Sequence, residues 1–164
     1  MKLYGVVGWK DTGKTGLVTR LVSYFTGQGL RVSTLKHTHH AVDLDPGPSD
    51  TARHRDAGAA QVILASEARL ALLEEGDVPC SPVALMERLA PVDLVIAEGW
   101  KAGSHPRIEA YRASCNQPPI AAKDKTIRAI ASDTPEISTP VGCMVFDLND
   151  TSAIAAFIAK DIGL

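Results

Sequence analysis

Hydrophobic and polar residues alternate in blocks along the start of the chain, and these blocks predict a strand, a helix and a second strand. The apolar run at residues 3–7, LYGVV, stops at a glycine and predicts a buried strand of a parallel sheet. Apolar residues then recur every four positions from Leu17 to Phe25, which predicts one buried helix face. The glycines at 27–29 end this helix, and the β-branched residues at 31–37 predict the next strand.

The rest of the chain continues with shorter elements. A polar stretch at 38–49 contains two prolines and predicts a long loop of the kind that is often functional. Further strands are expected at residues 61–66, 69–75, 93–100, 107–112, 126–133 and 142–150, and further helices at 50–58, 81–89 and 150–163. Because strands and helices alternate in the first half, the pattern predicts a three-layer α/β fold with a mostly parallel central sheet. The chain has no internal repeat and no clear linker, so a single domain over residues 1–164 is expected.

The stretch GWKDTGKT at residues 8–15 fits the phosphate-loop pattern G-x-x-x-x-G-K-[ST]. Glycines let the backbone curl around phosphate oxygens, and the following helix adds free N–H groups and the positive end of its dipole. A chance glycine-lysine turn is the alternative, but the strand before the loop and the helix after it favour a P-loop NTPase-like domain. We predict Lys14 as the catalytic cation and Lys10, two places after Gly8, as a supporting one. The predicted nucleotide-binding residues of this segment are Gly8, Trp9, Lys10, Asp11, Thr12, Gly13, Lys14, Thr15 and Gly16.

A P-loop site also needs oxygen ligands for Mg²⁺. Thr15 offers a hydroxyl, and Glu98 follows the apolar run LVIA, so its carboxylate is expected where the carboxyl ends of parallel strands line a ligand crevice. Asp93 begins the same strand and is expected at the opposite edge. In the long loop, Asp45 or Asp43 is a further candidate that reaches Mg²⁺ through water, with a solvated loop acid as an equal alternative.

The stretch KHTHH at 36–40 ends the second predicted strand. A zinc site is disfavoured, because such sites usually have four ligands and no cysteine pair accompanies these histidines. One hypothesis places Lys36, His37 or His39 near the phosphates. The other has the histidines hydrogen-bonding the loop, and the role of the cluster formed by His37, His39 and His40 stays open.

Composition bears on which classes of partner and which compartment to expect for the protein. The net charge of −2 gives no support for a nucleic-acid partner. The three cysteines form no C-x-x-C pair, which favours a reducing compartment, and no segment approaches the roughly 20 apolar residues of a membrane span. We therefore expect a cytoplasmic protein that does not bind to or cross a membrane.

Several motifs together resemble the MobB family of molybdopterin-guanine dinucleotide biosynthesis adaptor proteins. They occur in the family's order: GWKDTGKT, KHTHH, the D-x-D-P-G-x-x-D stretch at 43–50, DTARHRDAGAAQ and VIAEGWK. The resemblance runs to about residue 133 and resumes at DLND near the end, so it covers most of the chain. It is far more specific than the phosphate loop alone.

The resemblance implies a P-loop GTPase-like fold, a homodimer, and binding of GTP with Mg²⁺ and at most weak hydrolysis. It also implies a partnership with the guanylyltransferase that builds the molybdenum cofactor, and molybdopterin is a further candidate ligand. Arg55, with Asp50 and Thr51, matches a family pattern, and its role is open between a ligand contact and a dimer contact. Glu98 stands where many P-loop proteins carry aspartate.

Base selection depends on a carboxylate that accepts the N1 and N2 protons of guanine. Asp133 follows an apolar strand and is the predicted residue, with a turn-starting aspartate as the alternative and no N-K-x-D motif in the chain. No residue stands out as the group that positions water, and no arginine finger is evident, so slow hydrolysis is expected. Two rival hypotheses are a P-loop small-molecule kinase, with Arg53 and Arg55 or Arg107 and Arg112 as lid residues, and an interaction module whose nucleotide is structural.

Overall fold

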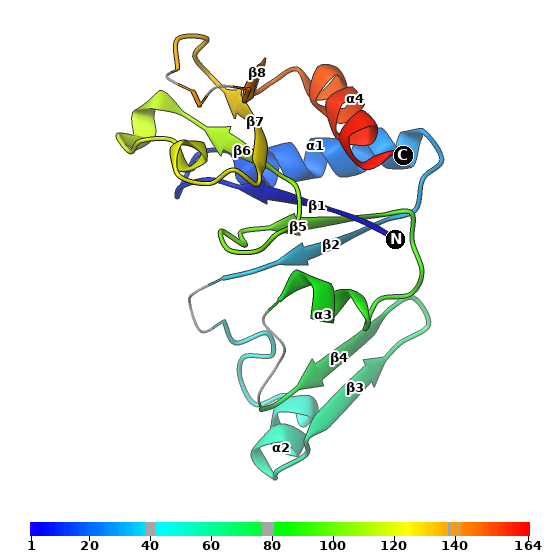
Figure 1. Cartoon of the computed structure of the whole chain (residues 1–164). Coiled ribbons are helices and arrows are strands. Elements are labelled where there is room, and N and C mark those ends of the chain that lie inside the picture. Colours follow the sequence, from blue (N-terminus) through cyan, green and yellow to red (C-terminus); the bar gives the residue numbers. More distant parts are fainter. Residues whose placement is uncertain (39–41, 77–80, 138, 141) are drawn as a thin grey trace. The chain divides into compact units, whose positions relative to one another are not determined.

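The structure is a computed structural model, shown in Figure 1. It describes residues 1–38, 42–76, 81–137, 139–140 and 142–164. The chain contacts divide into two compact units, one formed by Met1–His37 with Ser81–Leu164 and the other by Thr38–Cys80. Each unit is described on its own.

The first unit is built on a six-stranded sheet in which every neighbouring pair is parallel, in the order β2-β5-β1-β6-β7-β8. Its strands are β1 (Lys2–Val7), β2 (Val32–Lys36), β5 (Leu94–Glu98), β6 (Arg107–Tyr111), β7 (Ile127–Ser132) and β8 (Met144–Asp147). Its helices are α1 (Lys14–Gly27), α3 (Pro82–Met86) and α4 (Thr151–Ile162), with the short 3₁₀ turns η1 (Ala113–Cys115) and η2 (Ile120–Ala122). The prediction of an α/β fold with a mostly parallel central sheet is confirmed.

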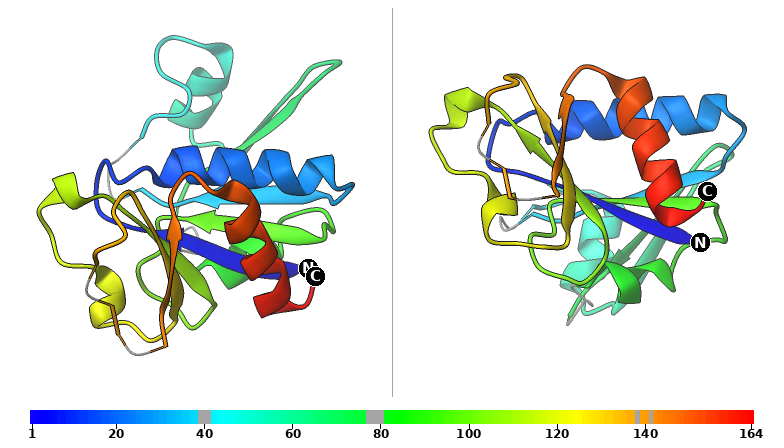
Figure 2. Two further views of the ribbon diagram at one scale, coloured as in Figure 1. Left: turned by 90° about the horizontal axis from the view of Figure 1, so that it is seen from above. Right: turned by 45° about the horizontal axis from the view of Figure 1, so that its top comes forward.

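Helices α1 and α4 lie on the same face of the sheet, and α3 lies on the other (Figures 1 and 2). The predicted apolar stripe of α1 is buried, with Leu17 and Leu21 fully enclosed and Phe25 nearly so. They pack in one core with Ile96 of β5 and Ile154 of α4. Burial of this stripe, at about 2 kcal/mol for each large side chain, fixes α1 over the sheet. The first turn of α1 therefore lies near the carboxyl end of β1, the strand that precedes it.

Strand register brings separate parts of the chain to one edge of the sheet. Because all pairs are parallel, the carboxyl ends of β1, β5 and β2 meet there. Glu98, the last residue of β5, pairs with Val6 on one side and with Lys36 on the other. The phosphate loop leaves β1 at this same edge.

The second unit contains helix α2 (Asp50–Asp56) and a separate antiparallel hairpin of β3 (Gln61–Ala65) and β4 (Leu70–Glu74). Both strands were expected, and their hairpin pairing interrupts the alternation of strand and helix. Ser49 caps α2 by accepting a hydrogen bond of 3.0 Å from the amide of Ala52. Within its described residues, the unit thus packs one short helix with two strands.

Cys115 and Cys143 are free thiols, and Cys80 lies outside the described residues. In the described part of the chain, no helix combines the length and the apolar character that crossing a membrane requires.

Candidate functional site

The loop at residues 8–15 joins β1 to α1 and has a backbone that glycine permits. Gly8 has a φ of 151° and Gly13 a φ of 92°, and a Cβ on Gly8 would lie 2.3 Å from the carbonyl oxygen of Ala110. Gly13 is the N-cap of α1 and supplies no side-chain hydrogen bond to the helix. The first amides of α1 therefore have no side-chain cap, which is the arrangement that anion-binding helix starts use.

Two side chains of the loop close on one carbonyl. Thr12, fully buried, donates to the carbonyl oxygen of Trp9 at 2.9 Å, and the Lys14 ammonium donates to the same oxygen at 2.5 Å. Desolvation lowers the pKa of Lys14 from its ordinary value, while the nearby Glu98 carboxylate opposes that shift. Lys14 is thus a half-buried cation of the loop whose ammonium is bound to a backbone carbonyl.

Trp9 is held from two sides by segments distant in sequence. Its indole N–H donates to the carbonyl oxygen of Pro118 at 2.9 Å, and the Lys101 ammonium lies 4.3 Å from its ring centre. A cation over an indole face contributes about 0.5–1 kcal/mol at an exposed site. Trp9 therefore ties the phosphate loop to the segment that follows Glu98 and to the segment before η2.

Two buried charges on β6 hold those segments in turn. Arg107, 1% exposed, donates to the carbonyls of Trp100 and Gly103 and pairs with Asp124 at 2.8 Å. Glu109, fully buried, accepts from the amides of Ile120 and Ala121 at 2.9 and 2.8 Å, and burial raises its pKa. These two buried side chains thus hold the segments that contact Trp9.

Thr15 and Glu98 form the pair that the sequence predicted for the metal. The Thr15 hydroxyl donates to Oε1 of Glu98 at 2.7 Å, and the Glu98 side chain is 9% exposed. Gly99 follows with a φ of 99°, and a Cβ there would lie 2.7 Å from the carbonyl oxygen of His37. The backbone therefore requires a glycine at position 99, directly after the Glu98 carboxylate.

This oxygen pair fits Mg²⁺, which prefers hard oxygen donors and usually keeps waters and phosphate oxygens as its other ligands. The described residues contain no group of three or more histidine, cysteine, aspartate or glutamate side chains suited to hold a metal ion. At the ends of β1 and β5, Thr15 and Glu98 thus offer one hydroxyl and one carboxylate oxygen to a metal ion.

Asp133 lies in a cavity of about 490 Å³ at the ends of β7 and β8. Its Oδ1 accepts from the amide of Ala113 at 3.0 Å, and Asp147 and Asn149 line the same cavity. Leu148, between those two residues, has a side-chain carbon 3.4 Å from the position of a Cβ on Gly13. Two lining residues of the cavity thus flank a leucine whose side chain lies close to the start of α1.

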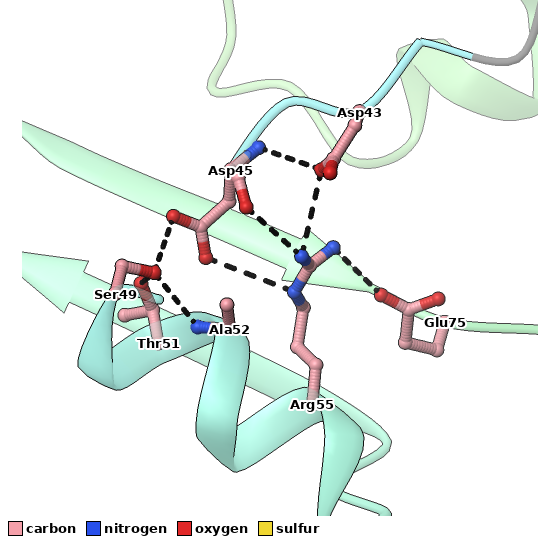
Figure 3. Close-up of polar contacts among 7 residues, drawn as sticks. All are labelled: Asp43, Asp45, Ser49, Thr51, Ala52, Arg55 and Glu75. Carbon is pink, nitrogen blue, oxygen red and sulfur yellow. Dashed lines mark hydrogen bonds and ion pairs between the residues drawn. The ribbon is translucent and has the colours of Figure 1, made fainter. Parts of the chain in front are cut away.

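The predicted residues Asp43, Asp45 and Arg55 come together in the second unit (Figure 3). The Arg55 guanidinium lies 3.5 Å from Asp43, 3.7 Å from Asp45 and 3.2 Å from Glu75. Hydrogen bonds from the hydroxyls of Ser49 and Thr51 lower the pKa of Asp45. The motif residues of the long loop thus meet around one arginine, which gives the D-x-D and arginine pattern a structural reason.

The remaining predicted residues that the structure describes lie in the phosphate loop and directly after β2. Lys10 and Asp11 are exposed in the loop, and Asp11 has a φ of 61°. The ring of His37 lies 5.1 Å from that of Trp100. His39 and His40 lie outside the described residues.

Several residues beside the loop were not predicted as part of the nucleotide site, although Arg112 was named as a lid residue of the alternative kinase. Lys101 stands on Trp9, and the guanidinium of Arg112 lies 3.4 Å from the position of a Cβ on Gly13. Lys101 is three residues after Glu98, so its nearness was accessible from the sequence once Glu98 was placed. Asp147 and Asn149 depended on the pairing of β8 with β7, which no local pattern reveals.

The parallel sheet, the glycine loop between β1 and α1, and the carboxylate ending the neighbouring strand define a P-loop NTPase-like α/β fold. A crystal structure described as molybdopterin-guanine biosynthesis protein B has this fold, with a TM-score of 0.74 and 26% sequence identity over 99% of both chains. The sequence model of the MobB family, described as molybdopterin guanine dinucleotide synthesis protein B, matches residues 3–133. The chain belongs to the MobB family.

Two relatives extend the similarity over nearly the whole chain. A protein of Escherichia coli K12 named molybdopterin-guanine dinucleotide biosynthesis adapter protein is 31% identical over 163 residues, covering 96% of this chain and 91% of that protein. A protein of the same name from Haemophilus influenzae is 32% identical over 158 residues, covering 95% of this chain and 86% of that protein.

Proposed function

We propose that this chain is an adapter in molybdopterin guanine dinucleotide biosynthesis that binds GTP with Mg²⁺ and assists the guanylyltransferase of that pathway. The observation that carries the proposal is the convergence of Lys14, Thr15 and Glu98 at the carboxyl ends of β1 and β5. A cation for phosphates and an oxygen pair for the metal thus stand together beside an uncapped helix start.

In this proposal the loop at residues 8–15 holds the phosphates, and Lys14 contacts the terminal ones. Thr15 and Glu98 hold Mg²⁺, which neutralises phosphate charge when bound. Asp45 remains a second candidate ligand, one that would have to loosen its contacts with Ser49 and Arg55 to take part. Thr15–Glu98 has the stronger support because its two oxygens already lie together.

Guanine recognition is assigned to the cavity that contains Asp133. A carboxylate accepts both the N1 and N2 protons of guanine, whereas adenine offers no matching pair of donors. Leu148, which lies between the cavity-lining residues Asp147 and Asn149, has a side-chain carbon 3.4 Å from the position of a Cβ on Gly13, and this supports a base pocket close to the phosphate loop. Its volume of about 490 Å³ accommodates a base and its ribose.

Hydrolysis is proposed to be weak. Lys14 and the metal ligands serve charge compensation on the phosphates, but Arg107 is buried in structural contacts and Arg55 in those of the second unit. Arg112 is exposed near Gly13 and remains the arginine best placed for phosphate contact. These placements also favour the adapter over the small-molecule kinase, because two of the candidate lid arginines are already engaged.

We also propose that the protein is a homodimer, which the hairpin of the second unit supports. Ile63 pairs with Leu72, and Leu70 shares their face; these side chains are 59%, 48% and 68% exposed. An isolated two-stranded hairpin is marginal in water, so an apolar face of this kind gains by meeting a second copy. Size-exclusion chromatography with light scattering tests this, and a monomeric wild-type protein would contradict it.

Calorimetry with GTP, ATP and GMP, each with and without Mg²⁺, tests nucleotide binding. The proposal expects GTP with Mg²⁺ to bind most tightly, and Lys14→Ala to lose about 100-fold in affinity or more while remaining folded. Loss of folding in Lys14→Ala would favour a structural nucleotide instead. A preference for ATP, or phosphoryl transfer from labelled nucleotide to an acceptor other than water, would contradict the proposal.

The adapter role is tested separately with purified guanylyltransferase, GTP and molybdopterin. Product formation is expected to rise when this protein is added and to rise less with Lys14→Ala. Direct titration with molybdopterin examines whether that compound is also a ligand. An unchanged rate with the wild-type protein would contradict the assistance.

A further inference from the structure

Lys36 lies within contact distance of both residues of the proposed metal pair. Its ammonium is 3.3 Å from Oε1 of Glu98 and 3.5 Å from the hydroxyl of Thr15, and those two oxygens are 2.7 Å apart. The three polar atoms form a compact triangle. A positive charge supplied by the chain therefore faces the two oxygens that a magnesium ion needs.

The sheet register accounts for this placement. Lys36 ends β2 and Glu98 ends β5, and the two are direct partners in the parallel pairing. Register partners in a parallel pair present their side chains on the same face, and Thr15 comes down from the first turn of α1 on that face. Strand pairing therefore places the two residues side by side, and the Lys36 side chain reaches the carboxylate from that position.

The Lys36 side chain is 62% exposed, while that of Glu98 is 9% exposed. Lys36 also lines a cavity of about 370 Å³ with Thr15 and Glu98. The carboxylate is therefore fixed, and the ammonium has room to leave it without disturbing the core.

An ammonium and a magnesium ion cannot share this position. Mg²⁺ binds oxygens at about 2.0–2.1 Å and would stand close to the ammonium, and two such cations a few ångströms apart repel even in water. The lysines near Lys14 and Glu98, with Lys14 itself, outnumber the two carboxylates there, so the bare site carries a net positive charge; the lysines are Lys14, Lys36 and Lys101, and the carboxylates are Asp11 and Glu98. A free metal ion is disfavoured there, whereas a triphosphate with its four negative charges reverses the balance.

We propose that Lys36 is an internal counter-ion that holds the metal position while no nucleotide is bound and moves to the terminal phosphate when the nucleotide with Mg²⁺ arrives. Only the move of Lys36 to the terminal phosphate rests on the proposed function. Lys36 then excludes free metal ions and favours a triphosphate over a diphosphate, because only the triphosphate gives the displaced ammonium a new partner.

The test uses Lys36→Met, which removes the charge at nearly constant length, and Lys36→Arg, which keeps it. Lys125→Met is the matched control, because Lys125 is exposed and precedes β7 at the amino end of the sheet. Circular dichroism melts establish that each variant is folded, and Lys36→Gln replaces Lys36→Met if the latter does not fold. Binding of Mn²⁺ without nucleotide is followed by electron paramagnetic resonance, and binding of GTP and GDP with Mg²⁺ by calorimetry.

In Lys36→Met, the affinity for Mn²⁺ alone and the affinity for GTP with Mg²⁺ are expected to change in opposite directions. Mn²⁺ alone binds at least about tenfold more tightly than to the wild type, because the competing cation is gone. GTP with Mg²⁺ binds at least about tenfold more weakly, while GDP changes by less than about threefold. Lys36→Arg and Lys125→Met stay near the wild type in the Mn²⁺ titration.

An unchanged or weaker Mn²⁺ affinity in Lys36→Met would overturn the counter-ion role. Equal losses for GTP and GDP would overturn the transfer to the terminal phosphate. If the wild-type protein binds no GTP at all, the proposed function fails by itself, and the Mn²⁺ titration still decides whether Lys36 keeps metal ions out.

Discussion

The Thr15 hydroxyl donates a hydrogen bond of 2.7 Å to the carboxylate of Glu98, a residue 83 positions later in the chain. Thr15 belongs to the first turn of α1, and Glu98 ends β5. The bond joins the two parts of the chain from which we expect the metal ligands to come. It makes the metal dependence of nucleotide binding the first property to test.

Glu98→Gln keeps an acceptor for Thr15 but removes the negative charge. We expect Mg²⁺ to strengthen GTP binding to the wild type by about tenfold or more and binding to the variant by less than about twofold. Calorimetry with and without Mg²⁺ measures both values. Asp93→Asn is the control, because Asp93 precedes β5 at its amino end and accepts from the amide of Arg31. A variant with full magnesium dependence would remove Glu98 from the metal site.

Asp133→Asn tests base recognition. The side-chain oxygen of the new asparagine still accepts from the backbone N–H of Ala113. Its side-chain NH₂ group, however, is a donor that would face the N1 and N2 donors of guanine. GTP affinity is expected to fall by roughly 100-fold, and xanthosine triphosphate, which carries an acceptor at that position, is expected to bind more tightly than GTP. Competition binding against a fluorescent nucleotide measures the order. Glu136→Gln, an exposed change in the same unit, should keep the wild-type order, and unchanged base preference in Asp133→Asn would place guanine elsewhere.

Gly8→Ala tests the shape of the phosphate loop. The new methyl would lie 2.3 Å from the Ala110 carbonyl oxygen and 2.6 Å from the Thr12 hydroxyl, so the loop must shift. We expect a loss of about 1–3 kcal/mol in the free energy of unfolding and a loss of detectable GTP binding. Gly27→Ala is the matched change, since nothing beyond its chain neighbours and its own helix backbone lies within 4 Å of its Cβ position, and it should bind GTP normally. Normal GTP binding by Gly8→Ala would show that the loop geometry is not needed.

Arg55→Met tests the hub of the second unit. Its side chain is 19% exposed, and removing the charge leaves Asp43, Asp45 and Glu75 facing one another. Since two of these carboxylates are more than half exposed, we expect only about 1–2 kcal/mol of destabilisation. Amide hydrogen exchange in residues 42–75 reports it locally. Arg53→Met, 72% exposed on the same helix, should leave exchange unchanged, and equal protection in both variants would deny Arg55 this role.

Asp124→Asn gives a prediction in pH. Partial burial acts to raise the pKa of Asp124, but hydrogen bonds from Thr126 and the Arg107 charge outweigh it and hold that pKa below its usual value. A lowered folded-state pKa stabilises the fold above the unfolded value and loses that contribution as pH falls through the folded one. Asp124→Asn should therefore cost about 3 kcal/mol at pH 7, because it leaves Arg107 buried without its partner.

Urea unfolding from pH 3 to 8 measures the difference between wild type and Asp124→Asn. The difference should be constant above about pH 5 and shrink below about pH 4, where the wild-type carboxylate takes up a proton. Glu136→Gln should show little difference at any pH. A gap that persists unchanged to pH 3 would mean that the charge of Asp124 is not what stabilises Arg107.

Local sequence patterns were sufficient to predict those features that depend on residues close together in the chain. The phosphate loop has a fixed spacing, and the apolar run before Glu98 identified a strand buried on both faces with a carboxylate at its end. Ser49 and Ser81 mark helix starts because a hydroxyl must accept a helix amide there, and both accept one in the structure. These features depend on neighbours within a few residues.

Features that depend on strand order were not predictable from the chain alone. The contact of Lys36 with Glu98 needs β2 to pair with β5, although 57 residues separate the end of one strand from the start of the other. Arg107 and Glu109 look like residues of an exposed strand, and their burial depends on partners in later turns. The pocket beside Asp133 likewise required the pairing of β7 with β8.

The most direct test is a crystal structure of the protein with a non-hydrolysable GTP analogue and Mg²⁺. The account predicts the triphosphate inside the loop at residues 8–15, the metal on Thr15 and Glu98, and the guanine against Asp133. A structure with the analogue bound at any other surface and this loop without phosphate would contradict it.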